Sequence, residues 1–82
     1  MRYYLLQQFL AATPRAVDMM TLSFLQIEQL INCSLPTSAW KHRAWWANDR
    51  THSQGRAWMQ AGFEVDEVDQ RDGRVRFVRK PQ

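Results

Sequence analysis

The sequence FEVDEVDQRDGRVRFVR, residues 63–79, decides the fold class. Two expected strands, residues 63–69 and 74–79, flank Asp72-Gly73, a dipeptide typical of hairpin turns, and the second begins with the alternation Arg74-Val75-Arg76-Phe77. We therefore expect an antiparallel hairpin over residues 63–80. With a two-residue turn, the facing pairs would be Val68 with Phe77, Asp69 with Arg76, and Asp66 with Arg79.

Two helices are expected in the N-terminal half of the chain. Apolar residues recur with helical spacing over residues 3–12, and Thr13-Pro14 ends that helix. A loop follows, with a short extended piece at residues 19–22. Ser23 with Gln26 forms a capping-box pattern, which predicts a second helix running to about residue 32.

A turn at residues 33–36 then leads to a third helix, predicted over residues 37–48. Thr51 with Gln54 forms a second capping-box pattern, and it predicts a fourth helix to about residue 61. Gly62 suits the position just after the end of that helix, because glycine readily adopts a positive φ.

This order of elements predicts an α+β fold of the winged helix-turn-helix type in one domain, residues 1–82. The helix-turn-helix would occupy about 23–48, the extra helix about 52–61, and the hairpin wing about 63–80. The extra helix means either that the third helix is broken or that the fourth is the recognition helix. The alternative is a small α+β domain that merely shares the order.

The composition narrows the class of protein. A single cysteine, Cys33, allows no internal disulfide, which favours a reducing, cytoplasmic location. No apolar run approaches the roughly 18 residues of a membrane span. Cys33, His42 and His52 lack metal-ligand spacing, and no nucleophile lies in a catalytic pattern. We expect a non-enzymatic protein without a metal or other cofactor.

The positive charge of the chain, +3, comes from residues 37–62. That segment has four cationic residues against one acidic residue, Asp49, and it holds both histidines and all four tryptophans. Cations interleaved with aromatic rings suit nucleic acid, which offers phosphates and stacking surfaces. Alternatively, the tryptophans build the core and the cations solvate its outside.

A continuous third helix would divide its tryptophans between two faces. Trp46 would share the inward side with Ala39, Trp40, Arg43, Ala44 and Ala47, and we expect it to be buried. Trp45 would lie on the other side with Lys41, His42 and Asn48. There it would either stack on bases or pack on the fourth helix through Trp58.

The function expected first is binding of nucleic acid, most simply duplex DNA, alone or as a homodimer. Phosphates would be neutralised by arginine and lysine, and bases would be read by Asn48 and His42. The candidate contact residues are Lys41, His42, Trp45, Asn48, Arg50, Ser53, Arg56 and, on the wing, Arg74. The alternative is a protein-interaction module, such as a small phage-encoded inhibitor of a host protein, because tryptophan and arginine dominate binding hot spots.

One segment also carries a family resemblance. Its core is His42-Arg43-Ala44-Trp45-Trp46-Ala47-Asn48-Asp49, followed by His52-Ser53, Ala57-Trp58 and Ala61-Gly62-Phe63. With Leu22-Ser23-Phe24, Leu35-Pro36 and Ser38-Ala39 upstream, residues 22–65 resemble a small, uncharacterised domain family of bacteria and phages. The resemblance implies no catalytic or binding residues.

Overall fold

The predicted C-terminal hairpin forms two of the three strands of an antiparallel sheet, in a computed structural model that describes residues 2–81. The strand order is β1-β3-β2, so the last strand is central. The elements are α1 (Tyr4–Ala11), β1 (Met19–Ser23), α2 (Phe24–Ile31), α3 (Thr37–Lys41), the 3₁₀ helix η1 (Arg43–Trp46), α4 (Ser53–Gln60), β2 (Phe63–Asp69) and β3 (Arg74–Arg79).

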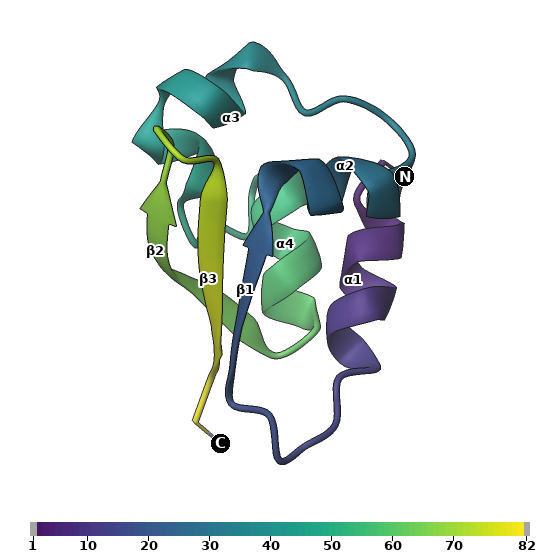
Figure 1. The fold of residues 1–82 in the computed structure, drawn as a ribbon. Coiled ribbons are helices and arrows are strands. Elements are labelled where there is room, and N and C mark those ends of the chain that lie inside the picture. Colours follow the sequence, from purple (N-terminus) through teal and green to yellow (C-terminus); the bar gives the residue numbers. More distant parts are fainter. Residues whose placement is uncertain (1, 82) are drawn as a thin grey trace.

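The helices α1, α2 and α4 lie together on one side of the sheet, and α3 lies near the hairpin tip (Figure 1). The core between these layers is strongly aromatic. Trp46, Trp58, Phe24, Phe63 and Phe77 are all fully buried. The expected α+β class is confirmed, and the order of elements is compatible with a winged helix.

Several local predictions are confirmed. Ser23 and Gln26 form the capping box, since the Ser23 hydroxyl accepts the Gln26 N–H and the Gln26 side chain accepts the Ser23 N–H. Gly62 follows the end of α4 with a φ of +90°. The extended piece before α2 is a true strand, β1, which pairs with β3.

The predicted hairpin register is wrong by two residues at the turn. Val68 faces Val75 instead of Phe77, and Asp69 faces Arg74. The turn spans four residues, 70–73, and Gly73 is its last residue, with a φ of +66°. The Asp69 carboxylate stabilises this longer turn by accepting the Asp72 N–H at 3.0 Å.

Farther along the hairpin, a bulge between Val65 and Glu67 shifts the register again. Phe77 therefore faces Val65, and Phe63 rather than Asp66 lies opposite Arg79. Such an extra residue increases the local twist of the strand pair.

The predicted third helix over 37–48 is also wrong. α3 ends at Lys41, because His42 adopts an extended conformation with φ −120° and ψ 115° before η1 begins. The Ala39 carbonyl accepts hydrogen bonds from the Trp46 indole at 2.8 Å and from Gln70. A continuous helix would point Trp45 and Trp46 in different directions, and the break lets both rings reach the core.

This break changes the predicted boundaries of the helix-turn-helix. The two helices of the expected unit, α2 and α3, are present and are joined by residues 32–36. Because α3 ends at Lys41, the second helix of the unit predicted over 23–48 is shorter than expected. The fourth helix, predicted at 52–61, is present as α4.

The second predicted capping box is wrong as well. α4 begins at Ser53, after His52, which makes no side-chain capping bond. The Thr51 hydroxyl instead donates to the Asp49 carboxylate at 2.6 Å, and the Gln54 amide donates to the Trp45 carbonyl.

Candidate nucleic-acid interface

The aromatic residues of the segment 37–62 serve mainly as core. Trp46 is fully buried, stacked between Phe24 at 4.8 Å and Trp58 at 5.7 Å between ring centroids, which confirms its predicted burial. Trp45 is half-buried and meets Trp46 and Tyr3 edge-on. Its ring is part of the packing, as in the alternative that places it against Trp58.

The remaining residues of the predicted inward side divide between core and solvent. Ala39 is fully buried, whereas Trp40 is 37% exposed and rests edge-on against Phe24. Arg43, which a continuous helix would turn inward, is exposed on η1. The helix break at His42 accounts for this difference, because it re-orients every residue after Lys41.

Asn48 was expected to reach a base, but its amide holds the fold together. Its Oδ1 accepts the Trp58 indole N–H at 3.0 Å and the Val65 backbone N–H at 2.8 Å. Its Nδ2 donates to the Val65 carbonyl at 3.0 Å. Two of these bonds tie the loop before α4 to strand β2 and the third ties it to α4, so the polar atoms of the side chain are engaged within the fold.

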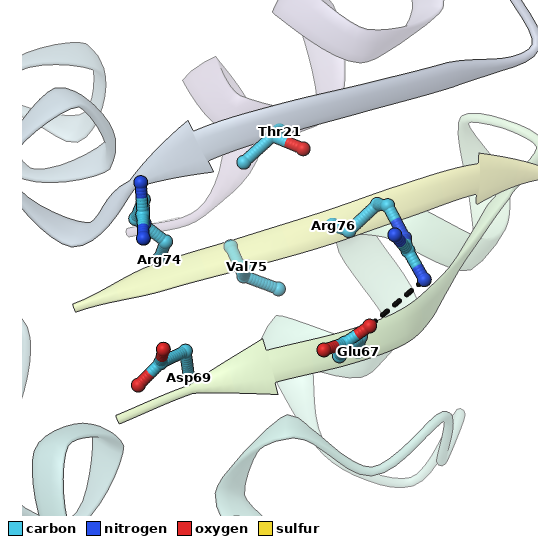
Figure 2. A pocket seen from close by; sticks show the side chains of 6 residues that line it. All are labelled: Thr21, Glu67, Asp69, Arg74, Val75 and Arg76. Carbon is cyan, nitrogen blue, oxygen red and sulfur yellow. Dashed lines mark hydrogen bonds and ion pairs between the residues drawn. The ribbon is translucent and has the colours of Figure 1, made fainter. Parts of the chain in front are cut away.

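The outer face of the sheet carries mixed charge that is largely paired. A hollow of about 150 Å³ lies there. Its polar lining is Thr21 on β1, Arg74 and Arg76 on β3, and Glu67 and Asp69 on β2 (Figure 2). Arg76 forms ion pairs with Asp66 at 2.6 Å and with Glu67 at 2.9 Å. The hydrogen bond to Asp66 raises the pKa of Arg76 above its usual value.

Arg74, the predicted wing contact, lies on this outer face and forms an ion pair with Asp72 at 2.9 Å. Five of the eight acidic residues of the chain lie on β2 and the turn. They are Glu64, Asp66, Glu67, Asp69 and Asp72. The hairpin is therefore a poor surface for a polyanion.

The surface where α1 packs beside α4 lacks the acidic residues that crowd the hairpin. Neither helix contains an acidic residue. Tyr4, Gln7 and Ala11 form one stripe of α1, and Ser53, Arg56 and Gln60 form the facing stripe of α4. We call this surface, with the cations at its two ends, the α1–α4 face.

Two hollows lie along the α1–α4 face. One, of about 260 Å³, is lined by the first turns of both helices and includes Arg2 and Arg56. The other, of about 540 Å³, is lined by their last turns and includes Arg15 and Lys80. Gln60 follows Ser53 by seven positions on α4, so the helical rise of about 1.5 Å per residue separates the two hollows by roughly 10 Å.

The cations of this face are not neutralised by carboxylates. Within residues 2–81, Arg2, Arg15, Arg50, Arg56 and Lys80 form no ion pair. Arg50 lies beside Arg56, whose guanidinium donates to the Arg50 carbonyl at 3.4 Å. Sequence reasoning missed Arg2, Arg15 and Lys80 as neighbours of this surface, because they lie far from 37–62 in the chain.

A family model described as a domain of unknown function, DUF7662, matches residues 3–81. The chain belongs to this family. The match spans almost the whole chain of this DUF7662 domain, and it confirms the expectation of a small, uncharacterised domain family. Searches among curated proteins and among solved structures find no match.

The predicted contact residues of the DUF7662 domain do not form one patch. Arg50, Ser53 and Arg56 gather at the start of α4. Lys41 and His42 are exposed at the end of α3, the helix that contacts the hairpin turn through Gln70. Trp45 packs against the core, the Asn48 amide bonds to Trp58 and Val65, and Arg74 lies on the sheet.

Among residues 2–81, no group of three or more His, Cys, Asp or Glu side chains is arranged to hold a metal ion. His52 lies 3.6 Å from Asp49, and the pKa of Asp49 is lowered by the two hydrogen bonds that it accepts from Thr51.

No helix between residues 2 and 81 has the length and apolar character needed to cross a bilayer.

Proposed function

We propose that this DUF7662 domain is a small, non-enzymatic nucleic-acid-binding module, most simply for duplex DNA, that uses the α1–α4 face. The observation that carries the proposal is the separation of charge. Five of the eight acidic residues gather on the hairpin, whereas α1 and α4 contain no carboxylate. Among residues 2–81, the unpaired cations are Arg56 on α4 and, just outside the two helices, Arg2, Arg15, Arg50 and Lys80. Phosphate contacts dominate the affinity of such proteins for nucleic acid.

The position of α4 supports the same proposal. In a winged helix the recognition helix precedes the wing, and α4 directly precedes the hairpin β2–β3. The stripe of α4 that borders α1 has exposed Ser53 and Gln60 and half-buried Arg56, with exposed Arg50 just before the helix. Arginine and serine contact phosphates, and glutamine is able to bond a base edge.

The interface therefore differs from the one expected from the sequence. Arg50, Ser53 and Arg56 remain in it. We no longer propose that Asn48 reads a base or that Trp45 stacks on one, because both side chains make contacts within the fold. Lys41 and His42 lie outside this face, and Arg74 is paired with Asp72.

A titration of labelled duplex DNA at several salt concentrations tests the proposal. The expected result is affinity that falls steeply with salt, because bound phosphates release counterions. Arg56→Gln should reduce the salt slope by about one unit, as the loss of one phosphate contact requires. Absence of binding by the wild type at low salt and micromolar protein would reject duplex DNA as the ligand.

A second candidate function is a protein-interaction module, with a second copy of the chain as the simplest partner. One observation favours it. Leu5, Phe9 and Leu25 are 38–63% exposed on α1 and α2, and Phe9 also lines a hollow of about 280 Å³. Sedimentation of the wild type and of Leu25→Gln distinguishes the two candidates, since only an apolar interface would be lost in the variant.

A further inference from the structure

The hollow at the first turns of α1 and α4 combines charge and hydrogen-bond donors from two segments that lie about fifty positions apart in the chain, residues 2–7 and 53–57. Arg2 reaches it from the N-terminus and Arg56 from α4, with Tyr4, Gln7 and Ser53 completing its polar lining. No acidic side chain lines it. A cavity of about 260 Å³ has room for a tetrahedral oxyanion with bound water.

The neutral groups of the hollow are able to donate. The Tyr4 hydroxyl accepts a hydrogen bond from Gln8 Nε2 at 3.0 Å, which leaves its own proton free to donate. Ser53 brings a further hydroxyl and Gln7 an amide. Burial raises the pKa of Tyr3 at the floor of the hollow, and the adjacent Arg2 side chain opposes that shift.

We propose that this hollow is a phosphate-binding site in which Arg2 and Arg56 grip one phosphate from two sides, assisted by Tyr4, Gln7 and Ser53. Guanidinium groups bind phosphate through paired, charge-assisted hydrogen bonds. Arginines on two separate elements fit a group whose oxygens point in several directions. The proposal rests on the proposed function in that the phosphate is supplied by a nucleic-acid backbone. A free phosphate has the same chemistry.

The site assigns a function to Arg2, which lies outside the segment 37–62. Arg2→Gln and Arg56→Gln remove one cation each from opposite walls of the hollow. Arg71→Gln is the matched control. Arg71 is exposed in the hairpin turn, so this substitution removes the same charge at a position away from the hollow. Thermal melts of all three variants show whether each is folded.

Two titrations decide the proposal. In the first, Arg2→Gln and Arg56→Gln should each lower the magnitude of the salt slope for duplex DNA by about one, and Arg71→Gln should leave it unchanged. In the second, inorganic phosphate should give a saturable ³¹P shift with the wild type and the control. That shift should be lost in both hollow variants.

The outcomes separate this site from the proposed function. If Arg56→Gln weakens duplex binding and Arg2→Gln does not, the nucleic-acid function stands and the two-sided site is overturned. If the wild type does not bind duplex DNA, the proposed function fails. A phosphate shift that depends on Arg2 would then support a site for free phosphate, and its absence would overturn the site.

Discussion

Replacing Asn48 with alanine should destabilise the fold rather than alter ligand preference. The substitution leaves the Trp58 indole N–H and the Val65 N–H without their acceptor, and the Val65 carbonyl without its donor. Trp58 is fully buried and Val65 is 5% exposed, whereas Asn48 itself is exposed, so water replaces only part of the lost hydrogen bonding.

The expected cost follows from these orphaned groups. Each buried donor left without a partner costs about 1–3 kcal/mol, so two donors that water satisfies in part predict a loss of roughly 2–4 kcal/mol. A domain of this size has only about 3–5 kcal/mol from its core. The variant should therefore be close to unfolding at room temperature.

Urea denaturation followed by tryptophan fluorescence measures this loss. With a denaturant slope of about 1 kcal/mol/M, the midpoint should fall by roughly 2–4 M, or the variant should fold only with a stabilising salt such as sulfate. Gln54→Ala is the matched control, since its amide makes one hydrogen bond, to the Trp45 carbonyl. The control should lose only about 0.5–1.5 kcal/mol.

A stability of Asn48→Ala within about 0.5 kcal/mol of the wild type would refute this reasoning. It would mean that the loop before α4 is not held to β2 through this side chain. Base reading by Asn48 would then return as an explanation for the residue.

Three further predictions concern the fold. Trp46→Ala should cost about 3–5 kcal/mol by urea denaturation, as expected for a fully buried large aromatic ring, and a much smaller loss would contradict its central position. Gly55→Ala should destabilise the start of α4, because a Cβ there would lie 2.4 Å from the Asp49 carbonyl oxygen. A melting temperature equal to that of the wild type would contradict this, since it would mean that the loop at Asp49 shifts without cost. The Asp49 carboxyl should titrate by NMR below its ordinary pKa, because its bonds from Thr51 favour the charged form. The stabilisation that those bonds give the folded state is fully present above the unfolded pKa of Asp49 and is lost as pH falls through the folded pKa. Thr51→Val should return the pKa of Asp49 toward its ordinary value.

Local signals in the sequence predict most elements of this fold. The Ser23 capping box, the glycine after α4 and the alternating strands all depend on residues within a few positions of one another. The hairpin register depends on a more distant contact. Gly73 closes the turn beside the Trp40 ring and accepts the Phe24 N–H at 2.7 Å, which no turn dipeptide reveals.

The break in the third helix has a similar origin. Helical spacing over 37–48 is real, but burying Trp46 and half-burying Trp45 outweighs the continuity of a helix. The prediction of the candidate site was incomplete for the same reason, because the site depends on contacts between residues far apart in the chain. Charge in the segment 37–62 pointed to Arg50 and Arg56, whereas Arg2 joins them only when α1 packs beside α4.

The central claim is that the α1–α4 face, and not the sheet, contacts nucleic acid. Its most direct test is a ¹H–¹⁵N correlation spectrum of the folded chain titrated with a short duplex at two salt concentrations. We expect salt-sensitive amide shifts over the first turn of α1 and residues 50–60, with little change around Thr21 and Arg76. Shifts centred on the sheet, or none at low salt, would contradict it.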